Sequence, residues 1–177
     1  MTSGTTSCVI AHKFCGDGSA LTGLAGFSAD SQENLYAGTG AGAASDADTC
    51  FNIAFGKGAG AALNEGDYNI FLGCYAGKGV TSGFQNVSIG LAAGCCRQSG
   101  GNNIAIGYEA LLGDTSTPSN NSGSTNIGIG LYVGYKLTTG ADNVFVGKQA
   151  GCKLTTGSDN IALGQLSMGA GTVTGAA

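Results

Sequence analysis

The side chains that could take part in catalysis or metal binding are few and lie far apart in the 177-residue chain. The only histidine, His12, has no nucleophile or carboxylate at the spacing that a catalytic site needs. The seven cysteines form no Cys-x-x-Cys pair and no cluster with histidine, which argues against a zinc site. Asp17 lies between two glycines, but the other ligands of a calcium loop are missing. We therefore expect no catalytic residue, no metal ion and no cofactor, and predict that the protein is not an enzyme.

Polar residues are nevertheless placed with strict regularity, because the motif Asn-apolar-x-apolar-Gly occurs eight times. The intervals between successive asparagines are 18, 17, 17, 17, 23, 17 and 17 residues. The copies begin at Asn34, Asn52, Asn69, Asn86, Asn103, Asn126, Asn143 and Asn160. A repeat of this length is typical of a solenoid, in which each copy is one structural unit.

The motif itself alternates with a period of two, which predicts a short strand with one apolar face. Glycines flank it and permit turns that need a positive φ. The later Lys-Leu-Thr-Thr segments, residues 136–139 and 153–156, predict a second short strand. Each copy should therefore make two strands and two turns.

Stacked copies would pair equivalent strands about 4.8 Å apart. The predicted fold is therefore all-β, a parallel β-solenoid or β-roll of about eight 17-residue coils. Equivalent asparagines would lie over one another, and their amides would form a structural ladder. Its members are Asn52, Asn69, Asn86, Asn103, Asn126, Asn143 and Asn160.

The repeat divides the chain into three parts. Residues 1–33 carry no repeat and are interpreted as an N-terminal attachment or neck segment, residues 34–168 form the array, and residues 169–177 form a tail. Residues 113–125 contain an insertion of polar turn formers, which we expect to bulge from the fifth coil. Its role is either receptor contact or a spacer. The candidate contact residues are Asp114, Thr115, Thr117, Ser119, Asn120 and Asn121.

Composition excludes several other classes of protein. There are 34 glycines but one proline and no period of three, which excludes collagen. No apolar run approaches the length of a membrane-spanning helix. The formal net charge of −4 argues against nucleic acid as a partner.

The cysteines leave two interpretations open. An odd number argues against a complete internal disulfide framework, and Cys95 and Cys152 share one repeat position but lie three coils apart. They are either small apolar side chains in the core or, for Cys8 and Cys15 in particular, partners in disulfides between chains.

The repeats, for example Asn-Ile-Ala-Ile-Gly-Tyr-Glu-Ala from Asn103, resemble the arrays of bacteriophage tail-fibre proteins and are similar to head repeats of trimeric autotransporter adhesins. Residues 14–24, Phe-Cys-Gly-Asp-Gly-Ser-Ala-Leu-Thr-Gly-Leu, resemble an element found upstream of such arrays in phage fibres. The resemblance implies a structural fibre protein of a virion, assembled in the host cytoplasm. It also implies a homotrimer that binds other virion proteins through its N-terminal segment and helps attachment to a host surface glycan or protein.

The chain itself offers a reason for a homotrimer. Each coil has only two or three large apolar side chains besides alanine, which is a thin core for one chain. Three chains around one axis would bury the remaining apolar face and cover strand edges.

The alternative is a non-viral extracellular solenoid, such as a filament subunit, an adhesin or an ice-binding protein. An autotransporter needs export devices, and we expect none, because Val9, Ile10 and Ala11 are the only apolar run near the start. Ice-binding faces repeat threonine in every coil, whereas Thr-Thr pairs occur here in only two copies. A glycan-cleaving tailspike needs paired carboxylates, but Asp142 and Asp159 share one repeat position and are interpreted as turn residues.

Overall fold

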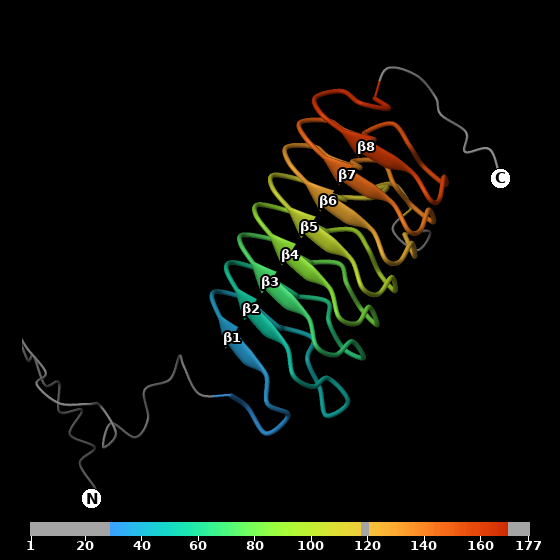
Figure 1. The fold of residues 1–177 in the computed structure, drawn as a ribbon. Helices are drawn as coiled ribbons and strands as arrows, with labels where there is room; N and C mark the ends of the chain where they lie inside the picture. Colours follow the sequence, from blue (N-terminus) through green and yellow to red (C-terminus); the bar gives the residue numbers. More distant parts are fainter. Residues whose placement is uncertain (1–28, 118–120, 170–177) are drawn as a thin grey trace, which may run out of the picture.

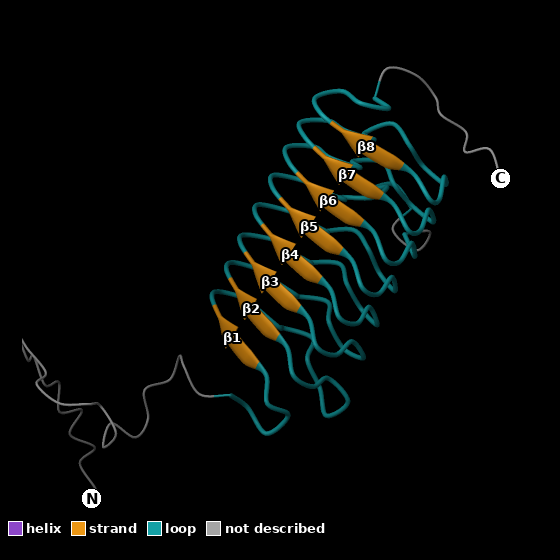
Figure 2. Cartoon of the chain, viewed as in Figure 1, coloured by secondary structure: helices purple, strands orange, loops and turns teal. Residues whose placement is uncertain are grey.

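The chain forms a parallel β-solenoid with one three-residue strand in each coil (Figures 1 and 2). The structure is a computed structural model and describes residues 29–117 and 121–169. The eight strands form one sheet in sequence order, and each pairs with the next in parallel. The chain makes seven turns of the solenoid between the first strand and the last. They are β1 (Leu35–Ala37), β2 (Ile53–Phe55), β3 (Ile70–Leu72), β4 (Val87–Ile89), β5 (Ile104–Ile106), β6 (Ile127–Ile129), β7 (Val144–Val146) and β8 (Ile161–Leu163). The predicted all-β solenoid is confirmed.

Two of the predicted regions fall largely outside the described residues. Most of the proposed N-terminal segment, residues 1–28, lies outside them, as do residues 170–177 of the tail and Ser119 and Asn120 of the insertion. The described residues contain no helix, and therefore none long and apolar enough to cross a membrane.

The second strand predicted in each copy is wrong. Residues 136–139 and 153–156 form turns and bends instead. The N–H of Leu137 donates to the carbonyl of Gly134 (3.0 Å), which closes a β-turn and curls the chain where an extended segment was expected. Neighbouring coils are still joined there, because the N–H of Thr138 donates to the carbonyl of Thr155 (2.8 Å).

In β2 to β8 the middle residue of each strand points into the coil and is buried, while its two neighbours point outward. The inward residues are Ala54, Phe71, Ser88, Ala105, Gly128, Phe145 and Ala162. The apolar face that the alternation predicts therefore lies on the outside of the solenoid.

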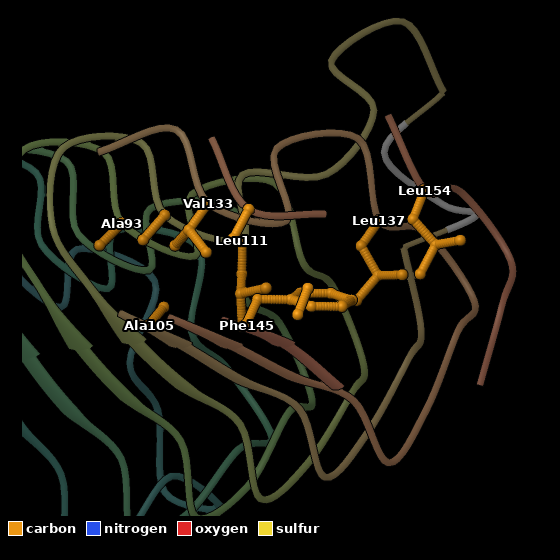
Figure 3. Packing of buried hydrophobic residues seen from close by; sticks show 10 residues of the cluster. Ala93, Ala105, Leu111, Val133, Leu137, Phe145 and Leu154 are labelled. Atoms are coloured by element: carbon orange, nitrogen blue, oxygen red, sulfur yellow. The ribbon is translucent and has the colours of Figure 1, made fainter. Parts of the chain in front are cut away.

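The interior holds two clusters of apolar side chains, one around Phe71 and one around Phe145. Figure 3 shows the cluster around Phe145. Both rings need glycine nearby: a Cβ on Gly77 would come within 2.5 Å of the Phe71 ring, and one on Gly151 within 2.9 Å of the Phe145 ring. Each large ring in the interior is thus surrounded by small residues, as close packing requires.

The fifth coil shows how a local exchange keeps this packing. Leu111 stands where six other coils have glycine, and it keeps the same left-handed backbone (φ 46°). Its buried side chain occupies the space that an inward strand residue of the next coil would fill. That residue is Gly128, on which a Cβ would lie 2.7 Å from Cγ of Leu111. Leu111 and Gly128 are therefore matched, because a larger residue in one coil requires glycine in the next.

The repeat asparagines form a continuous hydrogen-bonded ladder along the stack. In a typical rung, the N–H of Asn86 donates to Oδ1 of Asn69 (2.9 Å), and Nδ2 of Asn86 donates to the same oxygen (3.1 Å). Nδ2 also donates to the carbonyl of Gly100 (2.8 Å), which closes the coil that Asn86 opens. The rungs run from Asn34 to Asn160.

Removing one interior rung should be costly. We expect Asn86→Ala to lower the free energy of unfolding by roughly 2–4 kcal/mol, because buried donors and acceptors of two coils lose their partners. Asn64→Ala is the matched control, since Oδ1 of Asn64 has no hydrogen-bond partner, and it should change stability by less than about 1 kcal/mol. Urea unfolding followed by circular dichroism measures both. Equal effects of the two variants would contradict a stabilising role for the ladder.

Candidate functional site

The insertion leaves the wall of the solenoid after Gly113 and rejoins it at Asn121. The N–H of Gly113 donates to the carbonyl of Tyr135 (3.1 Å), and the N–H of Gln98 donates to that of Asn121 (3.1 Å), as in regular coils. Residues 114–120 therefore stand where every other complete coil from β2 onward has one residue, the eleventh after its asparagine. We call the eleventh residue after each repeat asparagine the core position. In the other coils it is occupied by Leu63, Val80, Arg97, Leu137 and Leu154, all of which are buried.

Asp114 and Asn121 fasten the base of the loop. Oδ1 of Asn121 accepts from the N–H of Asp114 (2.9 Å), and Nδ2 of Asn121 donates to the carbonyls of Cys96 and Asp114 (both 2.8 Å). The carboxylate of Asp114 accepts from Thr117 Oγ1 (2.7 Å) and from the N–H of Ser116 (2.8 Å), and these bonds lower the pKa of Asp114. Of the six candidate contact residues, Asn121 is thus buried at the loop base, and Thr115 and Thr117 are exposed.

Arg97 fills the interior space that the insertion leaves empty. It occupies the core position of the preceding coil and is only 3% exposed. Its guanidinium donates to the carbonyl of Gly123 and to that of Leu137 (3.4 Å), which belongs to the coil beyond the insertion. Burial lowers the pKa of Arg97 to about 10, and no described carboxylate offsets this. In the sequence, the sign of this buried role is that Arg97 occupies a repeat position that holds leucine or valine in other coils.

The loop and Arg97 should therefore be exchangeable together for a regular coil. We expect replacement of residues 114–120 by one leucine, combined with Arg97→Leu, to raise the midpoint of thermal unfolding. The reason is that an apolar column replaces a buried charge, whose charged form is penalised at every pH below about 10.

The single change Arg97→Leu is the control for this design. With the insertion kept, it should destabilise the protein, because the carbonyls of Gly123 and Leu137 lose a donor. A double variant less stable than the single variant would show that the insertion is part of the fold.

A surface groove lies beside the loop and was not anticipated from the sequence. It consists of two adjoining hollows of about 640 and 380 Å³, which share Tyr135, Lys136 and Thr155. The larger hollow is also lined by Glu109, Tyr132, Gln149, Cys152 and Lys153, and the smaller by Gly113, Asp114, Thr115, Ser116 and Thr138. These residues come from equivalent turns of successive coils, so that no contiguous motif marks them.

Three tyrosine rings are held against one another at this groove. The rings of Tyr132 and Tyr135 meet edge to face (centroids 5.5 Å, 82°), and those of Tyr108 and Tyr132 do the same (5.1 Å, 87°). Hydrogen bonding to Glu109, first among several causes, raises the pKa of Tyr108 to about 12. Such edge-to-face contacts fix the orientation of the rings.

The outer face of the sheet is a second candidate surface. Each of the eight strands turns its first and third residues outward, and all sixteen are apolar. At the last strand, Ile161 and Leu163 are 70% and 64% exposed. Exposed apolar residues also flank the sheet on both sides: Phe51, Tyr68 and Phe84 precede the strands, and Leu91, Tyr108 and Leu131 follow them.

The five described cysteines are not core residues, which corrects the first of the two interpretations for them. The five described ones are free thiols, and all are half-buried at the surface: Cys50, Cys74, Cys95, Cys96 and Cys152. Cys8 and Cys15 lie outside the described residues. No group of three or more potential metal ligands is found within residues 29–117 and 121–169.

Cys96 should be the most reactive of these thiols. A hydrogen bond from the adjacent Cys95, aided by Lys78, lowers the pKa of Cys96, whereas that of Cys95 is raised. Alkylation by iodoacetamide, followed by mass spectrometry, should show a fast phase whose rate rises at lower pH than that of the other thiols, as the Cys96 thiolate forms. Cys96→Ser should abolish this phase and Cys152→Ser should retain it; a fast phase that survives Cys96→Ser would contradict the assignment.

Comparisons with other proteins identified no relative of this chain. No protein-family model matches the chain, and no curated protein or solved structure is significantly similar to it.

Proposed function

We propose that this protein is a structural fibre protein of a phage virion, that it assembles as a homotrimer through the outer face of its sheet, and that it contributes to host attachment. The observation that carries the proposal is that all sixteen outward strand positions are apolar. An exposed apolar surface of this extent is typical of an interface.

The shape of this face favours a second copy of the chain as its partner. Seven spacings of about 4.8 Å give a stripe roughly 34 Å long, without interruption by a polar strand residue. A partner must offer an equally long and regular apolar surface, and another solenoid does so. The exposed apolar residues on both flanks of the sheet favour three copies over two, because each chain of a cyclic trimer contacts its two neighbours through two different surfaces.

The proposed fibre role is supported by the rod-like stacking together with the resemblance of the repeats to phage tail fibres. A solenoid adds about 4.8 Å of length with each coil and needs only neighbouring coils for stability. The insertion is the natural place for host contact, because loops that leave a solenoid can vary without disturbing the stack. The N-terminal segment would bind other virion proteins.

A charge placed in the middle of the sheet face should prevent assembly. Ile106 lies on the outer side of the central strand β5, and Ile106→Lys would put an unpaired ammonium group into the interface. We expect light scattering to give the mass of three chains for the unaltered protein and of one chain for this variant.

Thr139→Lys is the control for this experiment, because Thr139 is exposed in a turn away from the strands. It should leave the trimer intact. An unaltered protein that is monomeric at concentrations of tens of micromolar, or an Ile106→Lys variant that remains trimeric, would contradict the proposal.

A further inference from the structure

We infer that the groove beside the insertion binds an acidic saccharide. The inference deepens the proposed attachment role and rests on it for its biological meaning. The groove itself is defined by the described side chains alone. It crosses three successive coils, with Glu109 from the first, Tyr132 and Tyr135 from the second, and Gln149 and Lys153 from the third.

The lining matches the chemistry of a sugar ring. Pyranose rings present flat C–H faces, and the fixed rings of Tyr132 and Tyr135 offer apolar surfaces for them. Hydroxyl groups need both donors and acceptors, which Glu109, Gln149 and Thr155 supply. The groove is open at the surface and mixed in polarity, unlike the enclosed apolar pockets that anchor aromatic side chains of a protein partner.

Charge selects the acidic members of this class. The larger hollow contains Lys136 and Lys153, two of the seven basic residues of the chain, against one carboxylate, Glu109. The hollow is therefore positive on a protein whose formal net charge is −4. A carboxylate or phosphate on the saccharide would form charge-assisted hydrogen bonds with these lysines. The smaller hollow continues the groove with Thr115 and Ser116, and its carboxylate, Asp114, already accepts hydrogen bonds from Thr117 and Ser116. The acidic group of the saccharide is therefore assigned to the larger hollow.

The groove uses none of the residues assigned to the trimer interface. Its lining comes from turns and includes no outward strand residue and none of the six flanking residues, although Tyr108 of one flank contacts Tyr132. A trimer would carry three such grooves on one rigid rod. Simultaneous binding to a surface coated with the same saccharide would then raise the overall affinity well above that of one groove.

The repeat supplies substitutions that the fold already tolerates. Tyr132→Ala copies Ala92, which holds the same repeat position with the same left-handed backbone (φ 54°, against 53° for Tyr132). Lys136→Ala likewise copies Ala62. Tyr75→Ala is the matched control, because Tyr75 occupies the position of Tyr132 three coils earlier and outside the groove. Lys78→Ala is the control for charge, since Lys78 lies outside the groove, one residue before the repeat position of Lys136.

The test is binding of the full-length chain to an array of saccharides bearing uronate, sialate or phosphate groups, with neutral saccharides of equal length beside them. We expect binding to acidic members, weakened by salt, and reduced about tenfold or more in Tyr132→Ala and Lys136→Ala. Tyr75→Ala and Lys78→Ala should bind as the unaltered protein does. Absence of acidic-saccharide binding, equal binding of neutral saccharides, or equal losses in the control variants would overturn the inference.

Light scattering on the same samples separates this inference from the proposed function. A protein that is trimeric but binds no saccharide refutes the groove and leaves the assembly proposal standing. A protein that is monomeric and binds acidic saccharides through Tyr132 refutes the assembly proposal and leaves the groove standing.

Discussion

The hydrogen bonds of the buried asparagine amides set the register of the whole solenoid. From Asn52 to Asn143, each amide joins its coil to the preceding one and also closes its own coil, so that the position of one asparagine fixes that of the next. The rung from Asn103 to Asn126 is kept although 23 residues separate the two, with the N–H of Asn126 donating to Oδ1 of Asn103 (3.0 Å). Extra residues must therefore leave the wall, which is why the insertion becomes a loop and Arg97 fills the interior beneath it.

The same ladder explains why apolar side chains are displayed outward. With the asparagine buried at the strand's start, alternation turns the residue after it outward and the next inward, as Ile104 and Ala105 show. The narrow interior accepts mostly small residues there, and a phenylalanine only where glycines adjoin it. The larger aliphatic residues are therefore left on the surface, where a partner must cover them to remove them from water.

The 17-residue period and the Asn-apolar-x-apolar-Gly motif made the coarse fold predictable. Backbone pairing between similar coils depends only on the spacing of the repeats along the chain. The parallel stack, the stacked asparagines and the loop all follow from that spacing. The direction of the apolar face, the turn at Leu137 and the burial of Asn121 depend on three-dimensional context that one copy does not contain. The groove forms between coils, from residues such as Tyr132 and Lys153 that are about 20 positions apart in the sequence. Arg97 bridges two coils because the insertion leaves the interior of the coil between them unfilled.

Hydrogen exchange of the asparagine side-chain amides, followed by nuclear magnetic resonance, tests the central role of the ladder most directly. We expect the Nδ2 protons of the interior rungs, from Asn52 to Asn143, to exchange only when the solenoid unfolds. Those of the exposed Asn102 should exchange within the dead time. Exchange of the rung amides as fast as that of Asn102 would show that the ladder does not hold the coils together.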